Sequence, residues 1–159
     1  MLVTLINALS YISMTGDPIK SILAFTDFIA CLIITCLILF KGRYLKLGLT
    51  EKLVIVFSLL SIFIWFLLRS ATYANLLLQV AYVLAFVPTY VGVYKNASVE
   101  RALPWLLWTI SFIINLLVIA LRWNVAWQDF VNPVVAIVLH FGLALLVARG
   151  SNYAQITLN

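Results

Sequence analysis

The chain has 159 residues, of which 65% are hydrophobic and only 9% are charged, and its mean hydropathy is +1.16. A soluble domain carries roughly 25% charged residues, so this composition excludes an ordinary soluble protein and favours a membrane protein. The formal net charge of +5 does not indicate a nucleic-acid partner, because the basic residues lie at the ends of apolar runs, where they set membrane topology.

In chain order, the sequence predicts an all-α, polytopic integral membrane protein with five transmembrane helices. Residues 1–18 have apolar side chains at helical spacing but are too short to span a bilayer, so we expect a helix lying at the membrane interface. The predicted spans are 19–40, 53–70, 73–94, 104–122 and 130–148. They group into two helices over 19–72 and a three-helix bundle over 73–149, followed by a short polar tail over 150–159.

The basic residues are distributed unequally between the two ends of these spans. One side holds Lys41, Arg43, Lys46, Lys52, Lys95, Arg101 and Arg149, and the other holds Lys20, Arg69 and Arg122. The more basic side is expected to be cytoplasmic, which predicts an N-terminus outside and a C-terminus in the cytoplasm. The N-terminal segment lacks a basic region and a clear cleavage site, so we expect it to be retained.

Polar and aromatic residues recur at helical spacing within every predicted span. The stripes are Asp27, Cys31 and Thr35; Ser58, Ser61 and Trp65; Asn75, Gln79, Tyr82 and Phe86; Trp108, Ser111, Asn115 and Arg122; and Asn132, Ala136 and His140. At about 1.5 Å of rise per residue, Asp27, Gln79 and Asn132 form an outer layer, and Asn115 and His140 lie near the midplane. Because polar groups turn away from lipid, the two layers predict a polar cavity open to the outside.

Each of these residues also has a structural interpretation. Asp27 either serves function or forms an ion pair with Arg69 or Arg122, and His140 either bonds Asn115 across helices or takes part in ligand or proton binding. Asn115 and Gln79 are equally typical of hydrogen bonds that hold membrane helices together. Trp108 suits either an interfacial belt or contact with a solute, and Pro88 either kinks its helix or acts as a hinge.

Enzymatic chemistry is not expected. The chain has one His and few carboxylates, without a nucleophile–base spacing, a phosphate loop or a dinucleotide motif. Cys31 and Cys36 are five residues apart on one predicted helix, so they face different directions and provide no metal-binding spacing. We therefore expect no cofactor and no metal site.

Two short stretches resemble known transporters. Phe86-Val87-Pro88-Thr89, followed by Tyr94-Lys95-Asn96-Ala97-Ser98, resembles the Pro-Gln segment and loop of the PQ-loop and SWEET superfamily, with Thr89 in place of the Gln. The segment Glu100 to Trp108 resembles the Trp-x-x-Trp region of the related Pnu-type vitamin transporters, although Phe112 stands where those proteins continue with Asn or Asp. Asn132 matches a position that often binds substrate in SWEET-like bundles. The resemblance covers residues 75–149 and implies that the last three helices form a SWEET-like bundle that works as a homodimer.

The resulting hypothesis is a small transporter or facilitator of a sugar- or nucleoside-like solute, which works by alternating access in the lipid bilayer. Its predicted solute contacts are Asn115, Asn132, Gln79 and Trp108; Asp27 and His140 are the candidates for proton coupling, and Pro88 is the hinge. The alternative is a structural or accessory subunit of a membrane complex, whose polar stripes dock on partner helices and which transports nothing itself.

Overall fold

The computed structural model describes residues 1–41, 48–122 and 126–156, with side chains as far as Arg149. All regular structure in this part of the chain is helical. The elements are α1 (Leu2–Thr15), α2 (Pro18–Phe40), α3 (Leu49–Leu68), α4 (Ala71–Lys95), η1 (Ala97–Val99), α5 (Ala102–Leu121), η2 (Trp127–Phe130) and α6 (Val131–Ile156). Five of them, α2 to α6, are long and apolar enough to cross a membrane, which confirms the predicted number of spans.

Local sequence explains where the first two helices meet. Gly16 ends α1 with a left-handed backbone (φ 63°), a conformation that costs glycine little because it has no Cβ. Asp17 then caps α2, because its side chain accepts hydrogen bonds from the backbone N–H groups of Ile19 and Lys20. Pro18 occupies the first helical position, where a missing N–H has no cost.

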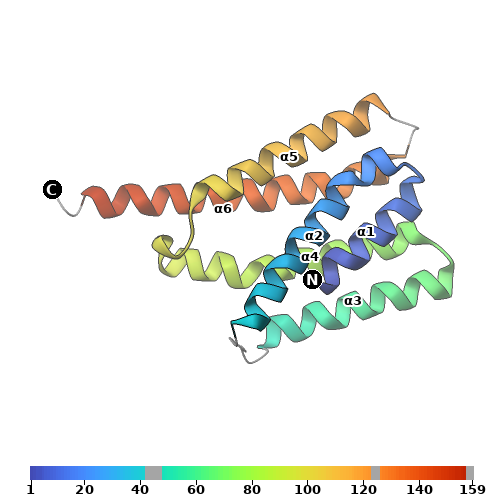
Figure 1. Ribbon diagram of the computed structural model, residues 1–159, viewed down its shortest axis with the longest axis horizontal. Coiled ribbons are helices and arrows are strands. Elements are labelled where there is room, and N and C mark those ends of the chain that lie inside the picture. Colours follow the sequence, from blue (N-terminus) through green and yellow to red (C-terminus); the bar gives the residue numbers. More distant parts are fainter. Residues whose placement is uncertain (42–47, 123–125, 157–159) are drawn as a thin grey trace.

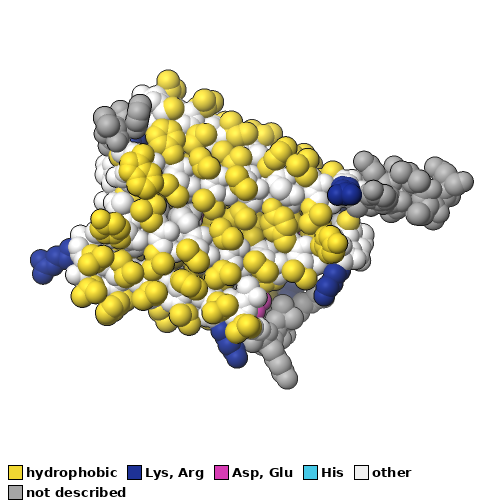
Figure 2. All heavy atoms as spheres, turned by 180° about the vertical axis from the view of Figure 1, so that it is seen from behind, with side chains coloured by type: hydrophobic (Ala, Val, Ile, Leu, Met, Phe, Trp, Pro, Cys, Tyr) yellow, Lys and Arg dark blue, Asp and Glu magenta, His cyan; other side chains and the backbone are white. Residues whose placement is uncertain are grey.

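The outer surface of the helices is apolar. Figure 2 shows hydrophobic side chains covering the face in view, with lysine and arginine gathered at its edges. Large side chains such as Phe66 and Leu121 are more than three-quarters exposed. So much contiguous apolar surface is suited to contact with lipid, as expected of an integral membrane protein.

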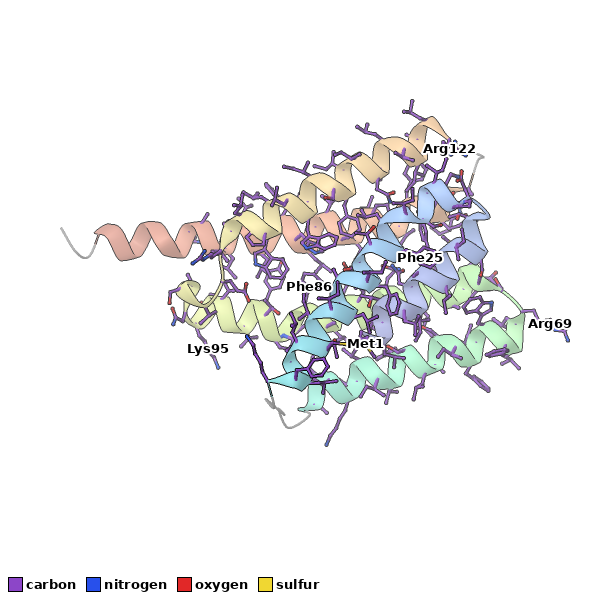
Figure 3. All side chains as sticks on the ribbon, in the orientation of Figure 1. Met1, Phe25, Arg69, Phe86, Lys95 and Arg122 are labelled. Atoms are coloured by element: carbon purple, nitrogen blue, oxygen red, sulfur yellow. The ribbon has the colours of Figure 1, made fainter. Side chains whose placement is uncertain are left out.

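The two ends of the bundle are distinct (Figures 1 and 3). The α1–α2 turn, the α3–α4 turn and the start of α6 share one end, which we name the Arg122 end. The connection from α4 to α5 and the last turn of α2 lie at the opposite end, which we name the Lys95 end. Among the residues whose placement is described, most basic ones belong to the Lys95 end, and the orientation they indicate stays a prediction. Arg43 and Lys46 lie outside the described residues.

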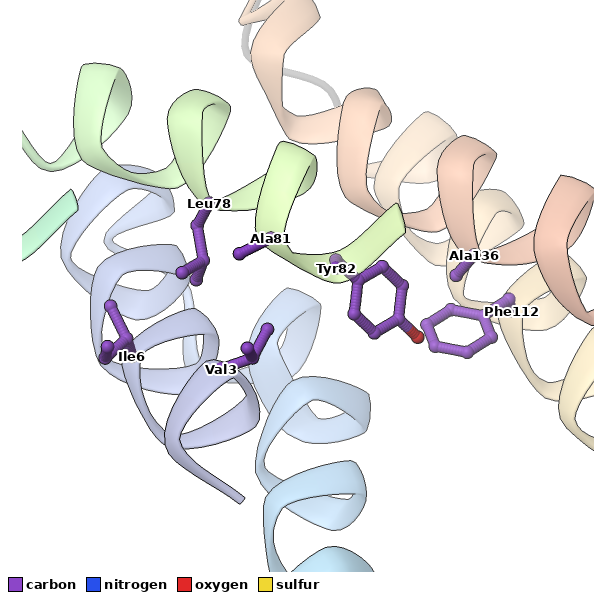
Figure 4. Packing of buried hydrophobic residues seen from close by; sticks show 7 residues of the cluster. All are labelled: Val3, Ile6, Leu78, Ala81, Tyr82, Phe112 and Ala136. Atoms are coloured by element: carbon purple, nitrogen blue, oxygen red, sulfur yellow. The ribbon is translucent and has the colours of Figure 1, made fainter. Parts of the chain in front are cut away.

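Five helices pack as a closed ring in the order α1, α2, α5, α6, α4, and α3 packs outside it against α4 and α1. α3 packs along α4, α6 lies against both α4 and α5, and α1 lies against α2 and α4. One core cluster joins α1, α4, α5 and α6 (Figure 4). Its members are Val3, Ile6, Leu78, Ala81, Tyr82, Phe112 and Ala136. Small residues such as Ala81 and Ala136 permit the close approach of helices that van der Waals packing needs within a membrane.

Helix α1 packs against the bundle, and its place relative to a membrane surface stays a prediction. Its apolar residues Val3 and Ile6 enter the core cluster, and its polar residues Asn7 and Ser10 are buried as well. Both of these faces therefore have partners within the bundle. At about 1.5 Å per residue the helix is roughly 21 Å long, so it accompanies the spans over only part of their length.

A second difference concerns the end of the chain. The predicted last span ends at residue 148, with a polar tail after it, whereas α6 continues to Ile156. Part of that tail therefore extends the final helix, and residues 157–159 lie outside the described part of the chain.

Candidate functional site

A buried amide cluster joins α1, α4 and α6 near the Arg122 end. It consists of Asn7, Ser10, Asn75, Gln79 and Asn132. The Asn75 Nδ2 donates to Asn7 Oδ1 at 3.1 Å and to Ser10 Oγ at 2.8 Å. The Asn132 Nδ2 donates to the same Asn7 oxygen at 2.7 Å. Asn7 is thus the acceptor on which two spans converge, and interhelical bonds of this kind hold membrane helices together.

Gln79 and Asn132, which the sequence suggests as solute contacts, are used within this cluster. The Gln79 Nε2 donates to the backbone oxygen of Asn75 at 3.2 Å and to its Oδ1 at 3.3 Å. Its Oε1 is buried without a hydrogen-bond partner in the described chain. Neither residue lines the cavity described below, so the outer layer of amides closes on itself instead of opening outwards.

Two ion pairs lie beyond the amide cluster at the Arg122 end. Lys20 Nζ is 2.7 Å from Asp129 Oδ2, with both side chains almost completely buried. The hydroxyl of Tyr11 donates to the backbone oxygen of Asp129 at 2.6 Å and fixes α1 on the same residue. Such a pair survives in a medium of low dielectric because each charge neutralises the other.

The second ion pair corrects an expectation about Asp27. Arg122 Nε lies 2.7 Å from Asp17 Oδ2, so this arginine pairs with the N-cap of α2 and not with Asp27. The hydrogen bond from Arg122, supported by the backbone N–H groups of Ile19 and Lys20, lowers the pKa of Asp17 from its ordinary value. No ion pair joins Asp27 to Arg69 or to any other base of the described chain.

A cavity of about 510 Å³ occupies the Lys95 half of the bundle. Its wall includes Thr50 and Glu51 in the first turn of α3, Trp105 in the first turn of α5, and Pro88 and Thr89 in the second half of α4. Deeper in the wall are Asp27 and Cys31 from α2, Tyr82 and Phe86 from α4, Trp108 from α5 and His140 from α6, together with the first turn of α1. Of the five residues of the two predicted layers, only Asp27 and His140 line this cavity, because Gln79 and Asn132 bond within the amide cluster and Asn115 lies elsewhere on α5.

Aromatic rings surround His140 at the cavity wall. The ring centroids of Phe86 and Phe112 lie 4.9 and 5.3 Å from that of His140, and those of Trp105 and Trp108 lie 5.7 and 6.1 Å away. Figure 3 labels Phe86 between the two ends of the bundle. The His140 Nδ1 lies 2.7 Å from the backbone oxygen of Ala136, so it is the nitrogen that donates within the helix. Its other ring nitrogen, Nε2, is then the one suited to external chemistry.

The structure therefore separates the predicted site residues into three groups. Asp27, Trp108, His140 and Pro88 share one cavity. Asn132 and Gln79 belong to the amide cluster. Asn115 is half-buried on α5, lies outside the cavity wall, and has no hydrogen bond with His140 among the described contacts.

Three important residues were not singled out by the sequence patterns. Asn7 lies in a segment too short to span, Glu51 stands at the border of a span, and Asp129 follows a loop. The available signal was weak: Asn7 and Ser10 are three residues apart and so share a helix face. Within the described chain no group of three or more His, Cys, Asp or Glu side chains is placed to hold a metal ion.

Comparisons of the chain with family models, with curated proteins and with solved structures find no match.

Proposed function

We propose that this protein is a small membrane transporter or facilitator for a polar solute. The observation that supports the proposal is the cavity of about 510 Å³ among apolar helices, which is lined by two carboxylates, an imidazole and two indoles. Polar and ionisable side chains are expensive at membrane depth and typically mark the path of a solute or an ion. Asp27, His140 and Trp108 are the proposed solute contacts, with Asp27 and His140 as the candidates for proton coupling.

In this proposal the two halves of the bundle act as site and gate. The solute enters the cavity in the Lys95 half, and the amide cluster and ion pairs at the Arg122 end form the closed gate. Pro88 lacks a backbone N–H, so the carbonyl of Leu84 loses its usual partner, and α4 has a weak point beside the cavity. Bending at Pro88 is the proposed movement that exposes the cavity to the other side.

The proposed assembly is a homodimer, which follows from the resemblance of residues 75–149 to a bundle that works in pairs. The orientation proposed is the one that the basic residues indicate, with the N-terminus outside and the C-terminus in the cytoplasm.

The alternative proposal is an accessory subunit of a membrane complex. One observation favours it: Ser111 and Asn115 lie one turn apart on α5, outside the cavity wall, and both are only half-buried. A polar pair on such a surface is suited to hydrogen bonding with a helix of another subunit.

Flux through proteoliposomes distinguishes the two functions. The purified full chain is reconstituted, and stopped-flow light scattering follows swelling with ribose, uridine or choline as the osmolyte. We expect faster swelling than in empty liposomes for at least one solute, loss of that flux in Trp108→Ala, and unchanged flux in the control Asn115→Ala. Swelling no faster than in empty liposomes with all three solutes would contradict transport.

A further inference from the structure

We propose that the cavity takes a monovalent organic cation, such as a primary amine or a quaternary ammonium with a small apolar body. This inference rests on the proposed function and names its substrate class. It comes from the pairing of two kinds of side chain on one wall: carboxylates from α2 and α3, and aromatic rings from α4 and α5.

The carboxylates are Asp27 and Glu51. Neither forms an ion pair within the described chain, where the salt bridges are Lys20–Asp129 and Arg122–Asp17. The hydrogen-bond partner of Asp27 is the thiol of Cys31, a weak donor with Sγ 3.9 Å from Oδ1. The amino group of Met1 also lines the cavity and attracts Asp27 electrostatically, so two carboxylates share this one ammonium among the described lining residues. A bound cation would balance the second carboxylate.

The aromatic residues are Tyr82, Phe86, Trp105 and Trp108. Cations are attracted to the faces of such rings when they lie within about 6 Å of the centroid, and tryptophan gives the strongest attraction. Phe86 and Trp105 have centroids 6.0 Å apart, so their rings form a continuous wall instead of isolated contacts. A ligand with a positive head and an apolar body matches both components of the cavity.

A neutral sugar fits this wall less well. The amides that bind hydroxyl groups most readily are absent from it, because Asn132 and Gln79 bond within the amide cluster and Asn115 lies elsewhere. Trp105 lines the cavity, and its Nε1 is buried without an acceptor in the described chain. The volume of about 510 Å³ falls within the range of about 300–1,000 Å³ typical of small-molecule sites.

Binding of choline to the full chain in detergent, measured by isothermal titration calorimetry, tests the charge requirement. The matched control ligand is 3,3-dimethylbutan-1-ol, which has the shape and hydroxyl group of choline but no charge. We expect choline to bind at least tenfold more tightly than this alcohol, and Asp27→Asn to remove most of that preference. Glu51→Gln should weaken choline binding less, because Glu51 stands at the end of its helix.

A second set of variants tests the aromatic wall. Trp108→Leu should weaken choline binding by about threefold to thirtyfold, the range expected for one cation–π contact. Trp105→Leu should also weaken the binding of choline, because it removes the other tryptophan ring of the cavity wall. Asn115→Ala lies outside the cavity wall and should bind like the wild type.

The outcomes separate this inference from the proposed function. Choline binding with the expected preference but without flux supports the cation site and contradicts transport. Flux of ribose or uridine with equal affinity for choline and the alcohol supports transport and overturns the cation site. If Asp27→Asn does not give a folded protein by size-exclusion chromatography, Trp108→Leu and Glu51→Gln decide the question: wild-type choline affinity in both overturns the inference.

Discussion

The Arg122 half and the Lys95 half of the bundle use polar residues in opposite ways. In the Arg122 half, Lys20 meets Asp129, Arg122 meets Asp17, and Asn7 accepts hydrogen bonds from two spans. In the Lys95 half, Asp27 and Glu51 form no ion pair within the described chain, and their side chains line a cavity. Polar groups that pair with one another hold membrane helices together, whereas polar groups that line a cavity without pairing are available to a ligand. The comparison predicts that substitutions in the first half lower stability and that those in the second half alter binding.

The largest expected effect is a loss of stability in the Arg122 half. Lys20→Met leaves the carboxylate of Asp129 buried without a counter-charge, which should lower the free energy of unfolding by about 3–5 kcal/mol. Thermal unfolding in detergent, followed by circular dichroism, measures the loss. The control Lys52→Met removes an exposed lysine and should have little effect. Similar losses of unfolding free energy in both variants would show that the buried ion pair does not stabilise the fold more than an exposed lysine does.

A smaller loss is expected from the amide cluster. Asn7→Ala removes the acceptor shared by Asn75 and Asn132, and hydrogen bonds between membrane helices contribute on average about 0.6 kcal/mol each and at most about 1.7. The unfolding free energy should therefore fall by about 1–3 kcal/mol, more than for Asn115→Ala, which removes a half-buried amide outside the cluster. Equal stability of the two variants would count against the cluster as a structural joint.

A substitution in the Lys95 half should change the unfolding free energy in the opposite direction. Asp27→Asn removes a carboxylate that lacks an ion pair at membrane depth, and this should leave the unfolding free energy unchanged or raise it by on the order of 1 kcal/mol. The same thermal unfolding measurement applies, with Lys20→Met as the contrasting variant. A clear loss of stability would show that Asp27 has a structural role, and the difference between the halves would then disappear.

The smallest effect concerns pH. The pKa of Asp17 is lowered in the folded protein, chiefly by the hydrogen bond from Arg122, so the stabilisation is present above the unfolded value of about 3.8 and is lost as the pH falls through the folded value. Wild type should therefore unfold at a slightly higher temperature than Arg122→Gln at pH 6, and the difference should shrink as the pH falls below about 3.8. Because Arg122 is half-exposed, solvent screens the pair and keeps the effect small. A difference that persists at acidic pH would assign it to packing of the arginine.

The fold was largely accessible from the sequence, and the site only in part. Runs of apolar residues marked the five spans to within a few residues, because length and hydropathy determine what crosses a bilayer. Helical spacing also predicted that Asp27, Trp108 and His140 face inwards, and they share a cavity. Spacing cannot reveal which polar side chains bond one another between helices. For that reason the sequence patterns assigned Asn132 and Gln79 to the solute. In the structure, Asn132 bonds Asn7 directly, and Gln79 is linked to Asn7 through Asn75. Asn7 was overlooked because its helix is too short to be recognised as part of the bundle.

The short helix α1 also has a consequence for how the protein is made. At 14 residues it cannot stay in a bilayer by itself, so during synthesis it has to enter together with α2 as a hairpin. One group that satisfies Asn7 is synthesised much later, since Asn132 lies 125 residues further along the chain on α6. Final assembly of the bundle therefore waits for α6, and a nascent chain stalled before it would present an unsatisfied amide to the quality-control machinery of the membrane.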